Sequence, residues 1–341
     1  MPSYPRCQIV VSDEAGIYHC VARCVRRTFL CGDDAASGRS FEHRKQWIED
    51  RLERLAEAMA VEVCGFAIMS NHLHVVLRIR PDRAADWSAD DVARRWLSIR
   101  LSSSEVDGQL LAARAAEIAA NDERVAELRG RLSCLSWFMR SLCEPIARQA
   151  NREDGCTGRF WEGRFKSQAL LDDAAVLACS IYVDLNPIRA GIATTPETSP
   201  HTSAYRRIES LQTQVSRQKK RPPSAPADHW LCPIALAGPA DPSSPSPRPT
   251  SFLDMNLTDY LRLLDWTGRQ FRLDKPGAIP AHLAPILDRL HIDSSRWPTT
   301  VRDFGRTFHR AAGRAQSLLA KASASSLRWL AGLSASRLAF A

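Results

Sequence analysis

The distribution of apolar residues over the first 80 positions predicts three strands and one helix. Residues 17–25, 61–69 and 72–79 are rich in β-branched and other apolar side chains, a composition typical of strands. Between the first two of these, apolar positions recur at helical spacing over residues 41–60. The polar pair at 70–71 is typical of a tight turn, so the second and third strands should form a hairpin.

Helical periodicity dominates the next part of the chain. Residues 81–130 are charged and rich in alanine, and they are predicted to be an inserted helical segment. Residues 132–151 form a further amphipathic helix, and a fourth strand is expected around 165–170. The acidic pair at 172–173 is suited to cap a helix that runs to Leu185.

This order of elements predicts the α+β class, with an antiparallel sheet that carries its helices on one face. The composition changes after this part, because nine of the 20 prolines lie between Pro222 and Pro249. We therefore expect a domain over residues 1–210, a Pro-rich linker over 218–250 and a helical C-terminal region over 251–341.

Arginines recur every four residues in the C-terminal region, while apolar residues mark another face. This spacing predicts one amphipathic helix with an arginine stripe that either grips phosphates or forms a solvated outer face. The stripe consists of Arg302, Arg306, Arg310 and Arg314.

Composition narrows the class of protein. Charged residues make up 25% of the chain and hydrophobic residues 45%, which is typical of a soluble globular protein. A net charge of +8 favours a polyanionic partner, although the arginine richness of proteins from a GC-rich genome gives the same signal. No apolar run reaches the roughly 18 residues that a membrane span needs. With no secretory segment at the start and ten scattered cysteines, we expect a cytoplasmic, nucleoid-associated protein with reduced thiols.

Two pairs of residues are candidates for metal binding and catalysis. His72 and His74 are two apart on a predicted strand, so their imidazoles face the same way and can share a divalent metal. Such a pair on its own is more often solvated or hydrogen-bonded. Tyr182 and Asn186 are four apart on a predicted helix and therefore share one face. Tyr182 offers a phenol nucleophile and Asn186 a neutral oxygen ligand, although a lone helical tyrosine most often packs beneath a sheet.

Four blocks of sequence, in their order and spacing, carry a resemblance to a known family. The chain resembles the HUH-type single-tyrosine (Y1) transposases, the IS200-like family, and within it the REP-associated tyrosine transposases. The resemblance covers about residues 15–206, and Ser70 stands where relatives usually have a proline. The blocks are residues 18–23, 69–74, 159–166 and 182–191.

This resemblance implies a ferredoxin-like sheet and a DNA strand transferase. It implies that Tyr182 is the nucleophile, which would form a 5′-phosphotyrosine and release a free 3′-OH. It also implies that His72, His74 and Asn186 bind the metal, and this mixed nitrogen and oxygen set suits Mg²⁺ or Mn²⁺. The expected partner is single-stranded or hairpin DNA, and the choice between a monomer and a homodimer stays open.

Basic residues near an aromatic side chain form the predicted DNA contact surface. Such a combination suits a single strand, because cations neutralise the backbone while rings stack on bases. The alternative is that the aromatic ring is core and the charges are solvated. The predicted contacts are Arg23, Arg26, Arg27, Arg159, Trp161, Arg164 and Lys166.

Two other functions fit the same residues. The first is a domesticated protein that binds hairpin DNA and no longer transposes anything. The second is an unrelated metal-dependent hydrolase of a small phosphoester, which would need neither Tyr182 nor a basic surface.

Overall fold

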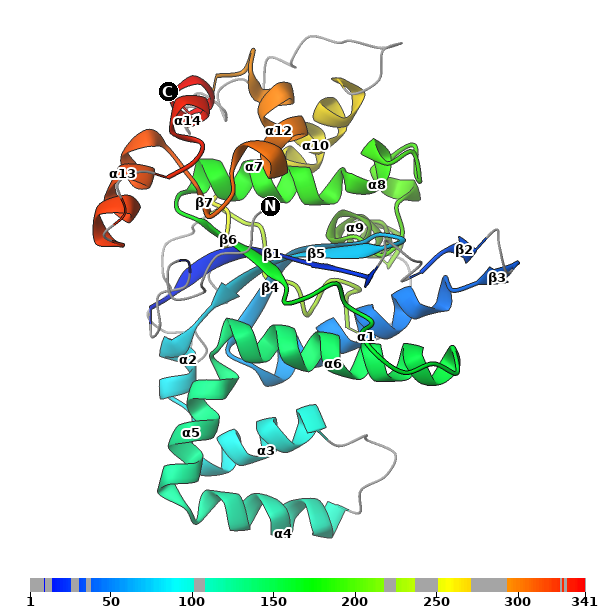
Figure 1. Ribbon diagram of the computed structural model, residues 1–341, viewed down its shortest axis with the longest axis vertical. Coiled ribbons are helices and arrows are strands. Elements are labelled where there is room, and N and C mark those ends of the chain that lie inside the picture. The colour runs from blue at the N-terminus through cyan, green and yellow to red at the C-terminus, as the bar shows by residue number, and fades with distance from the viewer. Residues whose placement is uncertain are drawn as a thin grey trace.

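A central five-stranded sheet organises the protein, with strand order β4-β5-β1-β6-β7 (Figure 1). The computed structural model describes residues 9, 14–25, 31–34, 38–100, 108–217, 225–236, 251–270, 293–325, 327 and 330–340. The strands of the sheet are β1 (Gly16–Arg23), β4 (Val61–Ile68), β5 (His72–Ile79), β6 (Lys166–Leu170) and β7 (Ala311–Ala312). Two short strands, β2 (Asp33–Asp34) and β3 (Arg39–Ser40), pair separately.

The four strands expected from the sequence form an antiparallel sheet. β1 lies between β5 and β6 and is antiparallel to both, and β4 is antiparallel to β5. β7 adds a fifth strand, which runs parallel to β6. The predicted α+β class is confirmed, and the complete sheet is mixed.

Helices cover both faces of the sheet, so the expectation of helices on one face is wrong. On one face lie α1 (His43–Ala58) and α6 (Leu135–Glu153), and on the other lies α7 (Asp173–Asp184), as Figure 1 shows. The reason is that the central strands have apolar side chains on both faces. Every residue of β4 is buried, for example, as is usual for a strand covered on both sides.

The inserted segment is helical, as predicted. α3 and α4 bury a small cluster of their own, in which Ala93 and Leu97 meet Ala115. The helices of the insert are α2 (Pro81–Ala85), α3 (Ala89–Arg100), α4 (Gly108–Ala119) and α5 (Asp122–Leu132). They extend from the α1 and α6 side of the sheet (Figure 1).

The C-terminal region adds α10 (Leu257–Gln270) and α12 (Trp297–Thr307), which share one apolar core with α7. Further helices complete the described chain, and none of the described helices is long and apolar enough to span a bilayer. They are α8 (Asn186–Arg189), the 3-10 helix η3 (Pro196–Thr198), α9 (Ser203–Arg217), α13 (Ala315–Ala324) and α14 (Leu333–Ala339).

The predicted single helix with an arginine stripe is wrong. α12 ends at Thr307, and Phe308 is extended and buried against the core. The chain then forms β7 on the open edge of β6, and α13 begins after Arg314. Burial of Phe308 and pairing with a free strand edge outweigh the four-residue spacing of the arginines. Arg310 therefore does not continue the row of Arg302 and Arg306.

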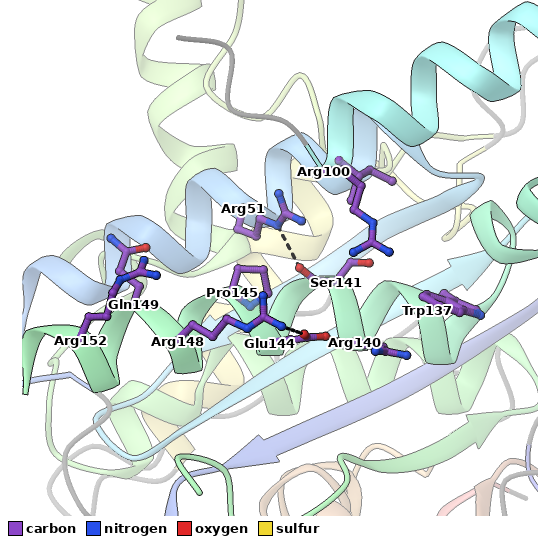
Figure 2. Close-up of a pocket in the computed structure, with 11 residues that line it drawn as sticks. Arg51, Arg100, Trp137, Arg140, Ser141, Glu144, Pro145, Arg148, Gln149 and Arg152 are labelled. Atoms are coloured by element: carbon purple, nitrogen blue, oxygen red, sulfur yellow. Dashed lines mark hydrogen bonds and ion pairs between the residues drawn. The ribbon is translucent and has the colours of Figure 1, made fainter. Parts of the chain in front are cut away.

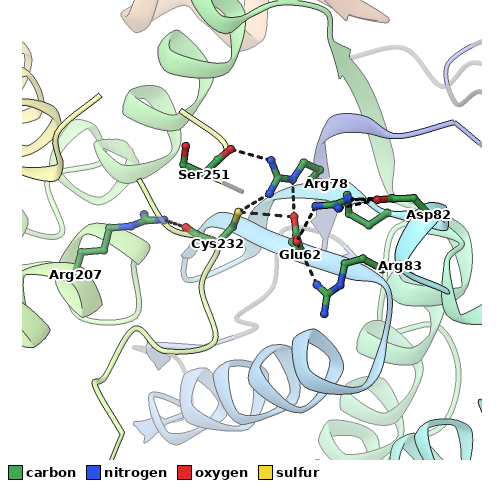
Figure 3. Close-up of polar contacts among 8 residues, drawn as sticks. Glu62, Arg78, Asp82, Arg83, Arg207, Cys232 and Ser251 are labelled. Atoms are coloured by element: carbon green, nitrogen blue, oxygen red, sulfur yellow. Dashed lines mark hydrogen bonds and ion pairs between the residues drawn. The ribbon is translucent and has the colours of Figure 1, made fainter. Parts of the chain in front are cut away.

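Part of the expected linker packs against the sheet. Leu231 pairs with Val63 of β4, and the backbone N–H of Cys232 donates to the carbonyl of Val63 at 2.8 Å. Figure 3 shows Arg78 of β5 in contact with the Sγ of Cys232 (3.1 Å) and with the carboxylate of Glu62 (2.5 Å). Residues 225–236 are thus not an unpacked linker, and 218–224 and 237–250 lie outside the described residues.

Candidate active site

Strand β5 places His72 and His74 on one face of the sheet, as the sequence predicts. Their ring centroids are 4.9 Å apart. His74 is buried at 4% exposure, whereas His72 is half-buried at the start of the strand. The face that carries them is the one covered by α7, because Val76 on the same face packs in the core of that helix.

A third histidine joins this pair. His19 of β1 is fully buried, and its Nε2 lies 2.9 Å from Nδ1 of His74, with the two rings stacked. His19 is not among the site residues that the sequence predicts. The β1–β5 register brings it there by pairing Val21 with His74. No spacing within the chain reveals that register, although His19 stands in the first of the four blocks.

All three imidazoles are neutral near pH 7. Burial lowers the pKa of His19 and of His72 to about 4. Burial also holds the pKa of His74 well below its usual range, with His72 as a further cause. A neutral imidazole has one nitrogen with a free lone pair, which is the form that binds metals.

Helix α7 brings Tyr182 against these rings. The helix begins where the side chain of Asp172 accepts a hydrogen bond from the backbone N–H of Ala175 (3.1 Å), so the predicted cap is confirmed. The ring centroid of Tyr182 is 5.7 Å from that of His74 and 5.9 Å from that of His19. The guanidinium of Arg189 lies 4.9 Å from the centre of the same ring.

The C-terminal helix α12 also contacts Tyr182. The ring of Phe304 lies 5.8 Å from that of Tyr182, centroid to centroid. Gly305 leaves room for the phenol, since a Cβ at this position would lie 2.7 Å from the hydroxyl oxygen. Tyr182 is therefore held between the imidazoles and a helix that is more than 100 residues away in sequence.

Asn186 lies one turn after Tyr182, as expected, and its side chain is buried. Its Nδ2 donates to the carbonyl of Tyr182 at 3.0 Å, which leaves its Oδ1 available. None of the described contacts joins Asn186 to the imidazoles, so its role as a ligand stays a prediction. Gln168 lies opposite His19 in the β1–β6 register and is buried, and its side chain is a hydrogen-bonding neighbour of that imidazole.

A cavity of about 440 Å³ opens beside His74 and Tyr182. Positive side chains dominate its lining, with Glu162 as the one acidic residue among those that line it. Like-signed charges in a concave site concentrate their field, so the cavity attracts anions such as phosphate. The cationic lining residues are Arg23, Arg164, Lys166 and Arg306.

The other predicted DNA contacts lie elsewhere or are not described. The indole N–H of Trp161 donates to the carbonyl of Cys143 on α6 (2.8 Å), and its ring packs at the edge of the core on that side of the sheet. Arg159 is exposed and does not line the cavity. Arg26 and Arg27 lie outside the described residues.

The histidine pair fits a divalent metal. Nε2 of His74 is buried and has no hydrogen-bond partner among the described residues. Nδ1 of His72 lies 2.6 Å from Oδ1 of Asn71. Because an amide oxygen only accepts, Nδ1 of His72 carries the proton and Nε2 keeps its lone pair. Each histidine thus offers one unprotonated nitrogen.

A separate group of potential ligands lies far from this site in the fold. Glu53 and Glu57 of α1 and His229 form the one cluster of three His or carboxylate side chains within ligand distance in the described part of the chain. The cluster is largely exposed, and nothing in its surroundings gives it a role beyond surface ion pairing.

Comparison with known proteins gives one structural likeness. No model of a known protein family matches the sequence, and no curated protein matches it. The chain is similar in structure to a solved REP-associated tyrosine transposase bound to a REP hairpin. The match covers 65% of this chain and 89% of that chain, at 12% sequence identity and a TM-score of 0.36.

Proposed function

We propose that this protein is a metal-dependent DNA strand transferase that cleaves and rejoins single-stranded or hairpin DNA through Tyr182. The observation that carries the proposal is the position of Tyr182, whose ring lies against His74 and His19 at the wall of an arginine-lined cavity. A phenol beside unprotonated imidazoles and a concentration of cations suits attack on a phosphodiester.

The reaction needs one bond to form and one to break. The hydroxyl oxygen of Tyr182 attacks phosphorus, and the bond from phosphorus to the 3′ oxygen of the preceding nucleotide breaks. The products are a 5′-phosphotyrosine and a free 3′-OH. The phenolic proton leaves through the solvent-open cavity, and the departing 3′ oxygen takes up one proton from the same solvent. The same 3′-OH, or one from another strand, can reverse the step without an external energy source, because one phosphodiester replaces another.

The side chains around the cavity would have separate roles in the reaction. His72 and His74 would hold Mg²⁺ or Mn²⁺, which when bound polarises the phosphate and reduces its repulsion of the nucleophile. Arg23, Arg164 and Lys166 would neutralise the backbone phosphates on either side of the cleaved bond. Arg189 lies over the ring of Tyr182 and would help to hold the phenol in place through this cation–π contact.

A covalent-trapping experiment tests the proposal. The protein is mixed with end-labelled hairpin and single-stranded oligonucleotides, with Mn²⁺ or with EDTA, and is run on a denaturing gel. We expect a metal-dependent shifted band that is absent from Tyr182→Phe. Tyr205→Phe is the matched control, because Tyr205 is a half-buried tyrosine on α9 outside the cavity, and it should retain the band. A band of undiminished intensity in Tyr182→Phe would exclude Tyr182 as the nucleophile.

A second candidate is a protein that binds hairpin DNA without cleaving it. The contact between α12 and Tyr182 favours this alternative, because the ring of Phe304 packs beside the phenol and restricts access to it. This function predicts retention of the hairpin in a native gel, no covalent band at any metal concentration, and equal affinity in the wild-type chain and in Tyr182→Phe.

A further inference from the structure

A second cavity, of about 290 Å³, lies on the opposite side of the sheet from Tyr182. It opens between α1 and α6, next to the end of α3 (Figure 2). Five arginines and a single acidic residue, Glu144, line it, so four positive charges in the lining have no negative counterpart there. The arginines are Arg51, Arg100, Arg140, Arg148 and Arg152.

The protein neutralises these arginines only in part. Arg140 and Arg148 share the one carboxylate of Glu144 from positions four residues to either side on α6. Arg51 donates through its Nε to the carbonyl of Ser141 at 3.0 Å, and this contact carries no negative charge (Figure 2). Within the described part of the chain, Arg100 and Arg152 make no ion pair and no side-chain hydrogen bond.

The crowding of cations costs free energy, and the titration of Arg51 reflects it. Burial, together with the neighbouring Arg54 and Arg100, lowers the pKa of Arg51 to about 10. A bound anion would remove this repulsion. The arrangement is therefore suited to a negatively charged ligand.

An aromatic ring lies among these charges. Trp137 of α6 lines the cavity, with the guanidinium of Arg140 at 5.0 Å from its ring centre and that of Arg131 at 4.4 Å. A second ring, Trp96 of α3, meets Trp137 edge to face at 5.8 Å. Trp96 is buried, whereas Trp137 is partly exposed. A guanidinium beside a partly exposed indole is typical of sites that contact both the phosphates and the bases of a nucleic acid strand.

We propose that this cavity is a second nucleic-acid contact, which binds backbone phosphates of a DNA strand through Arg51, Arg100 and Arg152. The inference rests on the proposed function in that the strand is taken to belong to the same DNA that Tyr182 attacks. It does not require cleavage. Arg100 is the last residue of α3, so the inserted segment contributes to this contact. DNA binding is thus the role that we infer for the insert.

Binding of labelled single-stranded DNA tests the inference. Fluorescence anisotropy is measured over a series of salt concentrations for the double variant Arg100→Gln/Arg152→Gln. This variant, its control and the reference protein all carry Tyr182→Phe, so that cleavage plays no part. These substitutions break no ion pair. The matched control is Arg94→Gln/Arg124→Gln, which removes two exposed arginines of the insert that pair with Asp90 and Glu127.

We expect the cavity variant to bind DNA about 10-fold more weakly at low salt, with a salt slope shallower by about one to two. The control should match the reference in both quantities. Equal affinity and equal slope in the cavity variant and the control would overturn the inference. The covalent band of an otherwise wild-type chain would survive that outcome, so the two proposals can fail separately.

A parallel titration with pyrophosphate distinguishes binding of a DNA strand from binding of a small anion. Isothermal calorimetry on the same proteins measures whether pyrophosphate binds and whether Arg100→Gln/Arg152→Gln abolishes that binding. If the substitutions abolish pyrophosphate binding but leave DNA affinity intact, the cavity is a site for a small phosphate compound and the inference is wrong. Loss of DNA affinity in the cavity variant supports the inference, whether or not pyrophosphate binds.

Discussion

His19 and His74 are stacked, with ring centroids 5.1 Å apart and His19 Nε2 at 2.9 Å from His74 Nδ1. Because one of these two nitrogens must carry the shared proton, the contact controls the tautomer of His74. When Nδ1 of His74 donates, its Nε2 is left with a lone pair, and this buried atom has no described hydrogen-bond partner. His19 is thus a positioning residue for the proposed metal ligand.

Loss of His19 should weaken metal binding. We expect His19→Ala to reduce Mn²⁺ affinity by about 10- to 100-fold, because His74 would lose the contact that fixes its ring and tautomer. His19→Gln should restore part of the affinity, since an amide oxygen can accept the same hydrogen bond. Calorimetric titration of Mn²⁺ measures both. His43→Ala, at an exposed position on α1, is the control, and an equal affinity in His19→Ala and His43→Ala would contradict the prediction.

The buried imidazoles should make the metal-free protein sensitive to mild acid. An unfolded histidine takes up a proton near its ordinary pKa of about 6.5, whereas His19 in the folded protein does so at about 4. Between these values the unfolded chain binds more protons, so the free energy of unfolding falls as the pH is lowered from about 6.5 toward 4. The loss is on the order of 3 kcal/mol for His19 alone.

Urea denaturation at a series of pH values checks this prediction. The window from pH 6.5 to pH 5 is the informative one, because most carboxylates titrate below it. His19→Gln should show a shallower decline than the wild-type chain in that window. Parallel curves for the two proteins would show that His19 titrates normally in the folded state.

Gly305→Ala should disturb Tyr182 more than it disturbs the fold. The new Cβ would lie 2.7 Å from the phenolic oxygen, so the ring must shift. Alanine is also the better helix former by about 1 kcal/mol, which offsets part of the strain. We expect covalent trapping to fall by about 100-fold, as for other misplaced nucleophiles. Gly163→Ala is the control in the same cavity, because a Cβ there meets nothing within 4 Å. Unchanged trapping in Gly305→Ala would contradict the prediction.

The C-terminal region should contribute to the stability of the sheet domain through Asp184. The hydroxyl of Tyr260 on α10 donates to Oδ2 of this buried carboxyl at 2.6 Å, while Ser203 and the backbone of Ala204 donate to Oδ1. Tyr260→Phe leaves Oδ2 without its donor. We expect the free energy of unfolding to fall by about 1–3 kcal/mol, measured by chemical denaturation. Tyr205→Phe should change it much less, and equal effects of the two substitutions would contradict the account.

Local patterns predicted the elements that surround the site. The third strand was expected over residues 72–79, which are the bounds of β5, because an apolar run follows a polar turn. The cap at Asp172 was also predictable from its acidic pair. Both features depend on neighbours in sequence. They place His72 and His74 on a predicted strand and Tyr182 on a predicted helix.

The contacts between distant elements were not predictable in the same way. His19 reaches His74 only through the β1–β5 register, and Gly305 reaches Tyr182 only through the packing of α12 on α7. The arginine spacing beyond Thr307 gave a wrong prediction, because burial of Phe308 and the free edge of β6 determine the backbone conformation there. The described contacts also leave open whether Asn186 is a ligand.

Identification of the residue that carries DNA tests the central claim most directly. The covalent adduct formed with Mn²⁺ is digested with trypsin and nuclease and analysed by mass spectrometry. Tyr182 is the single tyrosine of the tryptic peptide spanning residues 167–189. We predict that this peptide, and no other, carries a nucleotide on its tyrosine. A nucleotide on a different residue, or a cleaved strand with no protein attached, would contradict the claim that Tyr182 is the nucleophile.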